Sequence, residues 1–238
     1  MARRDVVKRA TALGAAGLLG GPLLFPPTSA SAAEQPLPAQ AAEARKRPTS
    51  PNGWELVGKP NGVSPVWTRP VPGTGFGVPV RIGDVETVLV HVVRRFHYEI
   101  AALREGDVAG WRAPSRVDVE GTEGNQASGT AVAIRPGSYP LGSAGGFFRP
   151  ELLVIRDILA ECNGIVRWSG DDHPPYEALF SIDVPPGDTR LRTLATTLRG
   201  WATEPGSGAG KPVDVTDRQR RKAAKEMERR QKALRPVP

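Results

Sequence analysis

One helical pattern dominates the chain and restricts the folds open to it. After Asp84, apolar side chains recur at intervals of three and four residues, at Val85, Val88, Leu89, Val92, Phe96, Ile100 and Leu103. This spacing predicts a helix with one buried face and with Asp84 as its N-cap. Such a face is stable only when other apolar elements cover it, so the rest of the chain must supply them.

Short apolar segments predict those other elements. The predicted strands cover residues 77–82, 131–134, 164–170 and 178–184. Two more helices are predicted, one with Pro150 in its first turn and one with Asp188 as its N-cap. Residues 53–202 are therefore expected to form one α+β domain, in which a small antiparallel sheet packs with helices.

The first 32 residues resemble an export signal. Arg3-Arg4 precedes a mildly apolar stretch, which ends at the small-residue sequence Ala30-Ser31-Ala32. This order predicts a twin-arginine-type signal peptide over residues 1–32 and a secreted, extracytoplasmic protein that faces the cell wall. The alternative is an uncleaved membrane anchor, but glycines and Pro22 interrupt the apolar run before the roughly 20 residues of a membrane span. No transmembrane segment is expected in the mature protein.

The charged residues are concentrated at the two ends of the chain. Residues 1–32 carry four basic side chains and one acidic, and residues 217–238 carry nine basic and three acidic. Of the net charge of +7, the residues between these ends therefore hold −2. They contain no basic stripe interleaved with aromatic residues, so nucleic acid is not an expected partner.

Two predicted linkers and a tail flank the domain. Residues 33–52 are rich in alanine, proline and charge, and residues 203–216 in glycine, proline and serine, so both predict flexible segments. Residues 217–238 predict a basic helical tail with almost no apolar face. Two interpretations of this tail stay open: a solvated, partly disordered helix, or electrostatic attachment to anionic wall polymers.

Residues 124–133, GNQASGTAVA, resemble the first motif of the zinc D-alanyl-D-alanine carboxypeptidase and dipeptidase family, in particular its secreted actinobacterial type. That motif reads S-x-H-x-x-G-x-A-x-D, and its histidine and aspartate bind zinc. Gly129 and Ala131 match it, and Pro140-Leu141-Gly142 follows as in the family. Gln126 stands at the histidine position, and Ala133 stands at the aspartate position.

A second family motif places an acid two or three residues before the third ligand, a histidine, in a strand that often reads M-H-F-E. The corresponding stretch here is Tyr176-Glu177-Ala178-Leu179-Phe180-Ser181, so Leu179 stands at the histidine position. The resemblance spans about Gly53 to Trp201. It implies the D-Ala-D-Ala carboxypeptidase fold, also called Hedgehog/DD-peptidase-like, with all three zinc ligands replaced.

The replaced positions exclude the family's zinc chemistry. A catalytic zinc needs three protein ligands and one open position for water, and Ala133 and Leu179 have no donor atom. Without the metal, a water molecule is not a usable nucleophile at neutral pH. We therefore expect no zinc, no other cofactor and no catalytic residue at Gln126, Ala133 and Leu179.

Other reactive groups in the sequence give weaker signals. His91 and His97 are six residues apart and do not share a helix face, and His97 is expected to be structural. His173 follows Asp171-Asp172, which is either a solvated turn or a weak metal site. Ser128 has no base nearby in sequence for nucleophilic chemistry. Cys162 is the only cysteine, so no internal disulfide forms and the thiol is expected to pack as a small hydrophobe.

The resemblance also implies a substrate groove. Family members hold the terminal carboxylate of the substrate with an arginine upstream of the first motif, which Arg116, or else Arg112, would supply here. The other candidate substrate-binding residues are Ser128, Asp171, Tyr176 and Glu177.

Three functions stay open. The first is an inactive, cell-wall-associated protein that binds peptidoglycan stem peptides or a partner without hydrolysis. The second is an active peptidoglycan carboxypeptidase with a metal site rearranged around Asp171, His173 and Glu177. The third is a purely structural module whose groove is filled by its own side chains.

Overall fold

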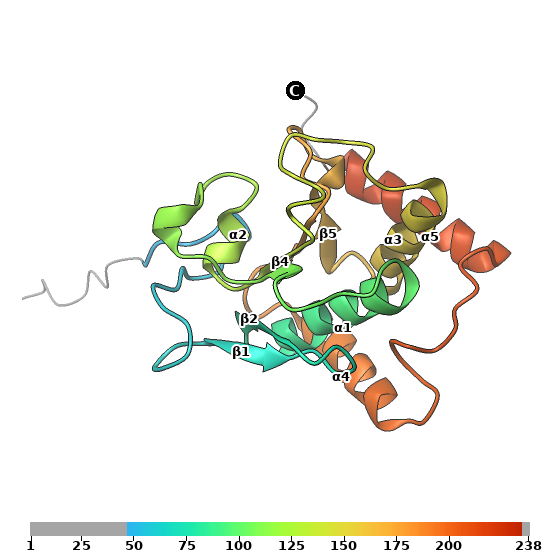
Figure 1. Cartoon of the computed structure of the whole chain (residues 1–238), viewed down its shortest axis with the longest axis horizontal. Helices are drawn as coiled ribbons and strands as arrows, with labels where there is room; N and C mark the ends of the chain where they lie inside the picture. Colours follow the sequence, from blue (N-terminus) through green and yellow to red (C-terminus); the bar gives the residue numbers. More distant parts are fainter. Residues whose placement is uncertain (1–46, 235–238) are drawn as a thin grey trace, which may run out of the picture. The chain divides into compact units, whose positions relative to one another are not determined.

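The computed structural model describes residues 47–234 (Figure 1). The strands are β1 (Val66–Pro70), β2 (Gly77–Arg81), β3 (Val108–Ala109), β4 (Ala131–Ile134), β5 (Val166–Trp168) and β6 (Leu179–Ile182). The helices are α1 (Asp84–Glu99), α2 (Gly124–Ala127), α3 (Arg149–Glu161), α4 (Thr189–Thr203) and α5 (Arg218–Ala233). The predicted signal, residues 1–32, and most of the predicted linker 33–52 lie outside the described residues.

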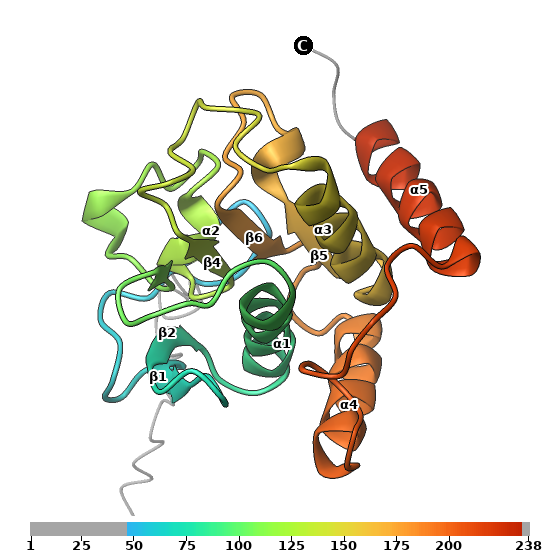
Figure 2. The same cartoon turned by 45° about the vertical axis from the view of Figure 1, so that its right-hand side comes forward.

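Two small antiparallel sheets pack with the helices, which confirms the α+β class. Strands β1 and β2 pair in one sheet, and the other has the strand order β3-β4-β6-β5. Helices α1 and α3 contact strands of the larger sheet. Helix α4 packs against α1, and α5 packs against α3, so the sequence-distant elements α3 and α5 lie side by side (Figure 2).

Most predicted elements are present, with small shifts at their ends. Helix α1 begins at Asp84, but its N-cap is Gly83, and the Asp84 carboxylate accepts a hydrogen bond of 2.7 Å from Arg199 of α4. Asp188 caps α4 as predicted, because its side chain accepts from the Arg190 N–H. Strand β1 was not predicted. Only Val66 of its five residues is buried, so the strand lacks the alternation that marks a half-buried strand.

The larger sheet has two chemically different faces, because successive side chains of a strand point to opposite sides. Val132, Phe180 and Trp168 are paired across the sheet and form one apolar row. The neighbouring row consists of Ala131, Ser181 and Arg167 and lies on the other face. That second face carries a groove, since Arg167 and Ser181 line it.

Helix α5 is part of the packed domain, which differs from the expected solvated tail. Ala224, Met227 and Gln231 lie along one stripe of the helix and are buried. The Gln231 side-chain amide donates a 2.7 Å hydrogen bond to the Val166 carbonyl of the edge strand β5. This stripe contains one apolar side chain larger than alanine, so hydrophobic periodicity alone does not mark it.

The two predicted linkers also contain residues that are anchored to the domain. Ser50 is buried, and its hydroxyl lies 2.9 Å from that of Ser128. The segment 203–216 is held to α1 by a 3.0 Å hydrogen bond from Arg94 to the Ala209 carbonyl. Hydrogen bonds to backbone and hydroxyl groups therefore fix segments whose composition is typical of flexible chain.

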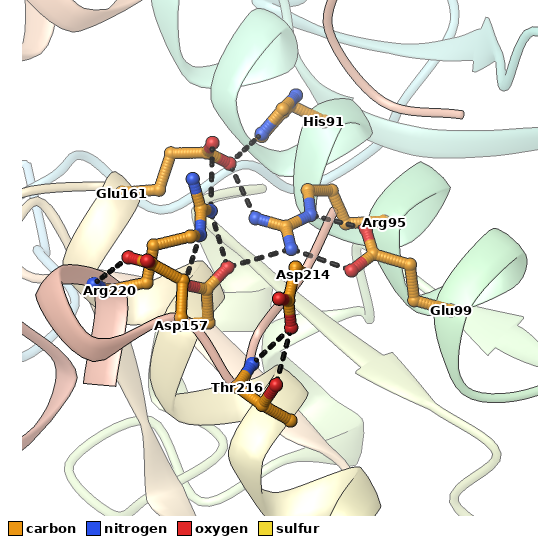
Figure 3. A network of polar contacts seen from close by, with 9 residues as sticks. His91, Arg95, Glu99, Asp157, Glu161, Asp214, Thr216 and Arg220 are labelled. Atoms are coloured by element: carbon orange, nitrogen blue, oxygen red, sulfur yellow. Dashed lines mark hydrogen bonds and ion pairs between the residues drawn. The ribbon is translucent and has the colours of Figure 1, made fainter. Parts of the chain in front are cut away.

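A buried ion network joins α1, α3 and α5 (Figure 3). The Arg95 side chain is only 2% exposed, and its guanidinium contacts Glu99 of its own helix and Asp157 and Glu161 of α3. Arg220 of α5 donates to both oxygens of Asp157, at 2.8 and 2.5 Å. His91 lies 2.9 Å from Glu161. Because a buried charge is tolerated only when it is paired, this network sets how the three helices meet.

The network shifts the ionisation of its members. Burial alone would raise the pKa of Glu161, but the hydrogen bond from His91 and the charge of Arg95 lower it from 4.5 to about 2. Burial would lower the pKa of Arg95, but its three carboxylate partners raise it instead. Both groups are therefore charged at neutral pH.

We predict that Met227→Ala lowers the free energy of unfolding by about 2 kcal/mol, because it removes a buried side chain from the α3–α5 contact. Urea denaturation of the whole protein measures this change. Glu226→Ala, on the exposed side of the same helix, is the matched control and should change stability by less than about 0.5 kcal/mol. Equal effects of the two substitutions would mean that α5 does not pack as described.

A second prediction concerns acid stability. The pKa of Glu161 is lower in the folded state than in the unfolded state. The ionised Glu161 therefore adds about 3 kcal/mol to the free energy of unfolding above its unfolded-state pKa of 4.5, and this stabilisation is lost as the pH falls from there toward 2. The loss of stability between pH 6 and pH 3 should therefore be smaller in Glu161→Gln than in the unmodified protein. The control Glu105→Gln, at an exposed position, should keep the full loss. Urea titrations at both pH values make the comparison, and an unchanged loss in Glu161→Gln would contradict it.

Candidate functional site: a closed ligand position and an adjoining groove

Two of the three positions at which the resemblance implies zinc ligands lie directly opposite each other. Ala133 of β4 and Leu179 of β6 are cross-strand partners, and Ala109 of β3 pairs with Ala133 on its other side. Directly opposed residues have their Cβ atoms about 5 Å apart on the same face of a sheet. This face is the one on which Arg167 and Ser181 lie, by the alternation described above.

The third position approaches the same place from α2. Helix α2 contacts both β4 and β6. The Gln126 side-chain amide donates hydrogen bonds of 3.1 and 2.9 Å to the carbonyls of Ala109 and Gly110. It thereby attaches to the residue that pairs with Ala133. The fold brings all three positions together, although 53 residues of sequence separate the first from the last.

The place where they meet is closed. Gln126 and Leu179 are 0% exposed, and Ala133 is 1% exposed. A methyl group and an isobutyl group have no donor atom, and the Gln126 nitrogen is committed to two backbone carbonyls. These three residues therefore do not fit a zinc ion.

The turn that follows Gln126 is held tightly against the smaller sheet. Gly129 has a φ of +73°, and a Cβ atom there would lie 2.5 Å from Val66 Cγ2. Its carbonyl accepts a 2.8 Å hydrogen bond from the Arg81 N–H of β2. Only glycine satisfies both the left-handed backbone and this close approach.

Ser128 is a structural residue. It is fully buried, its hydroxyl donates to the Asn125 carbonyl at 3.0 Å, and it lies 2.8 Å from the Thr130 hydroxyl. It therefore takes no part in an accessible binding surface, in contrast to its prediction as a substrate-binding residue.

Glu177 is also committed to the fold. Its two carboxylate oxygens accept hydrogen bonds of 2.8 Å from the N–H groups of Gly145 and Gly146, and the residue is 5% exposed. A Cβ atom at Gly146 would lie 2.9 Å from one of these oxygens, so glycine is needed for the approach. The carboxylate that was predicted to contact substrate instead fixes the loop before α3.

Tyr176 occupies one of the two possible general-base positions of the resemblance, but its chemistry is that of a phenol. The residue is 4% exposed. Burial raises its pKa, and the nearby charge of Glu123 adds to this, while Arg112 opposes it. A phenol with a raised pKa stays protonated at neutral pH and does not act as a general base.

The two arginines proposed to hold a substrate carboxylate lie elsewhere. Arg112 donates to Glu123 at 2.5 Å and to the Arg116 carbonyl at 3.1 Å. Arg116 lies in the 3-10 turn Pro114–Arg116 and is exposed. Neither residue lines the groove, so the structure does not bring them together with Asp171.

The groove beside the closed position has a volume of about 700 Å³. Among the residues that line it, Ser181 and Asp183 lie on β6 and the chain after it. Lys232 lies on α5. The strand β5 and the loop after it contribute Arg167, Ser169, Asp171, Asp172 and His173. Asp171 is the one predicted substrate-binding residue that lies here. Arg167, Ser169, Ser181 and Lys232 were missed, because nothing in the sequence shows that β5 and α5 meet at this face.

Ion pairs set the charge of the groove. Both oxygens of Asp171 are bound by the Arg156 guanidinium of α3, one of them at 2.6 Å, and Lys232 lies 3.8 Å from the same carboxylate. Burial opposes the charge of Arg156, but the Asp171 carboxylate outweighs this and raises the pKa of Arg156. Asp172 is paired with Arg167. The floor of the groove therefore contains fixed charges of both signs.

The histidines do not form a common site. His97 Nδ1 accepts a 2.8 Å hydrogen bond from the Leu103 N–H, so it closes the end of α1. His91 belongs to the buried ion network, whereas His173 is exposed at the groove. Within residues 47–234 there is no group of three or more histidine, cysteine, aspartate or glutamate side chains placed to hold a metal ion. Cys162 is buried, and burial raises the pKa of its thiol. The thiol therefore stays protonated and packs as a small apolar side chain.

Across the described part of the chain, no helix has the length and apolar character that a bilayer span requires. No protein-family model, curated protein or solved structure matches the sequence or the fold.

Proposed function

We propose that this protein is an exported, cell-wall-associated domain with a D-Ala-D-Ala carboxypeptidase-like scaffold, and that it binds peptidoglycan stem peptides without hydrolysing them. The family's zinc position is closed by side chains in this proposal, and ligand binds in the adjoining groove. The observation that carries the proposal is the meeting of Gln126, Ala133 and Leu179.

This meeting supports the resemblance for a physical reason. The two sequence motifs that contain the three positions carry no information about strand pairing. A coincidental match would have no reason to bring them to one place on one face of the sheet. Instead, Ala133 and Leu179 are cross-strand partners and Gln126 binds the adjacent backbone. Such an arrangement suits a former three-ligand site.

The rival proposal of an active enzyme with a rearranged metal site has less support. It needs Asp171, His173 and Glu177 to act together. The Glu177 carboxylate is held by two backbone N–H groups, and Asp171 is held by Arg156. Both carboxylates would have to leave strong charge-assisted hydrogen bonds to bind a metal.

The purely structural alternative explains the closed position equally well, but it gives no role to the groove. A groove of about 700 Å³ that contains charged side chains falls within the size range of small-ligand sites. It lies on the face that the family's chemistry would use. We therefore favour binding over a purely structural role.

Restoring the three ligands tests the scaffold. We expect the unmodified protein to bind no stoichiometric zinc and to release no D-alanine from stem peptides. The triple variant Gln126→His, Ala133→Asp, Leu179→His should bind one zinc, seen by metal analysis and by a zinc-dependent rise in Tm. Hydrolysis is not expected to return, since Tyr176 cannot replace a carboxylate base.

The single variants and the double variant Gln126→His, Leu179→His are the controls. Each single variant should bind zinc far more weakly than the triple, because one ligand cannot hold the ion. If the triple variant folds without zinc and gains no stability from it, the scaffold assignment is wrong. If it does not fold, the double variant, with two of three ligands, should still show weak zinc-dependent stabilisation. Tight zinc in the unmodified protein would overturn the proposal.

We also propose that α5 holds the protein to anionic wall polymers. Its exposed side carries Arg221, Lys222, Lys225 and Arg229, while its buried side packs on α3. Clustered cations of this kind attract polyanions, and salt weakens the attraction.

Replacing these four residues by glutamine should remove most of the binding to isolated cell walls at ~50 mM salt and little of it at ~500 mM, as a sedimentation assay would show. The matched control replaces four exposed cations elsewhere, namely Lys59, Arg104, Arg149 and Arg192, by glutamine. Both variants lose the same net charge. Equal loss of binding would show that only net charge matters, and would contradict a binding role for α5.

A further inference from the structure

An apolar surface lies at one end of the α3–α5 pair. Phe148, the residue before α3, is 76% exposed, and Leu153 near the start of α3 is also exposed. Leu234, the residue after α5, is 81% exposed. The start of α3 and the end of α5 lie at the same end of the packed pair (Figure 2). We call Phe148, Leu153 and Leu234 the apolar end.

The fold turns the Phe148 ring outward on a fixed backbone. Its neighbour Phe147 is buried and stacks on Tyr139, with ring centroids 4.1 Å apart. The Phe148 N–H donates a 2.7 Å hydrogen bond to the Glu151 carboxylate, which fixes the entry of the chain into α3. The core thus takes the first phenylalanine, and the second is held at the surface. Large apolar side chains that gather on a surface are typical of places where a partner binds.

The charges around the apolar end are positive. Residues 141–150 and 230–234 contain no acidic side chain and three exposed basic ones, Arg149, Arg230 and Lys232. Arg149 and Arg230 form no ion pair with any residue of the described range 47–234. The acids that flank the two segments are engaged, because Glu151 binds the Phe148 N–H and Glu228 pairs with Arg156 and Lys232. A partner of this surface is therefore expected to be anionic.

We propose that the apolar end inserts into the surface of a bilayer that contains anionic phospholipids. Apolar side chains enter the boundary between headgroups and acyl chains, and neighbouring cations are attracted to the phosphates. Phe148 and Leu234 supply the apolar contact, and Arg149 and Arg230 supply the charge. None of the three apolar residues lines the groove, so a lipid surface and a groove ligand do not compete. Insertion goes beyond the binding of stem peptides and does not depend on it.

Fluorescence at position 148 of the full chain tests insertion. Cys162 is buried, so Phe148→Cys offers one accessible thiol for a polarity-sensitive nitrobenzoxadiazole label. The probes are vesicles of phosphatidylcholine with about one third phosphatidylglycerol. We expect a blue shift of the label and its quenching by spin-labelled lipid. Val63→Cys, labelled in the same way, is the matched control and should show neither, because Val63 is exposed before β1, away from α3 (Figure 1).

The probe has to be local because residues 1–32 also contain an apolar stretch. Any vesicle binding through those residues is common to both labelled variants. Only a difference between positions 148 and 63 therefore reports the apolar end.

The other residues of the surface are tested in the labelled Phe148→Cys chain by titration with vesicles. Leu234→Ser should weaken binding about tenfold, because it removes a large apolar side chain from the contact. Arg149→Gln together with Arg230→Gln should weaken binding to anionic vesicles about tenfold and change binding to pure phosphatidylcholine little. The control pair Arg104→Gln with Arg192→Gln removes the same charge from exposed positions elsewhere and should change binding less than about twofold.

The outcomes separate insertion from the proposed function. Equal responses at positions 148 and 63, or no response at 148, overturn insertion. Equal binding to neutral and anionic vesicles does so too, since the cations then play no part. A blue shift that grows with protein concentration without vesicles would show that a second copy covers the ring instead. If stem peptides do not bind but the label inserts, insertion stands and the proposed function fails; the reverse result leaves stem-peptide binding intact.

Discussion

The Arg95 guanidinium is the centre on which the packing of the helices depends. It is almost fully buried between α1 and α3, where it forms ion pairs with three carboxylates. Taking a charge out of water costs several kcal/mol, so α3 must stay close enough for Asp157 and Glu161 to compensate. Asp157 in turn binds Arg220, which draws the start of α5 into the same network. One buried cation thus specifies how three helices from distant parts of the sequence meet.

The placement of α5 has a direct consequence for the groove. Once Arg220 fixes its first turn, the helix runs along α3 and its last turns reach the edge strand β5. There Gln231 binds the Val166 carbonyl, and Lys232 lines the groove near Asp171. An edge strand with unpaired backbone groups is a risk for aggregation, and α5 covers part of it. The helix is therefore at once a support for the sheet and a wall of the groove.

Two neighbouring places on one face of the sheet have opposite character. Around Gln126, Ala133 and Leu179 the face is closed, and the Gln126 side-chain nitrogen is bound to two backbone carbonyls. Two residues further along β6, at Ser181, the face opens into the groove. The first place has the burial of a core, where Leu179 adds apolar volume. The second is lined by charged and hydroxyl side chains, as small-ligand sites often are.

By itself, the sequence determined the local elements. The spacing after Asp84, the alternation in residues 77–82 and the caps at Pro150 and Asp188 are short-range signals, and the helices and strands they predicted are present. The two motifs selected Gln126, Ala133 and Leu179, which the fold brings together. Only the tertiary structure decided that Ser128 and Glu177 serve the fold, that α5 packs, and that Arg167 and Ser181 face each other. Those facts depend on strand register and on contacts between residues far apart in the sequence, such as the hydrogen bond from Gln231 to Val166, which are 65 positions apart. No local pattern records such pairings, because each partner alone looks like an ordinary polar surface residue.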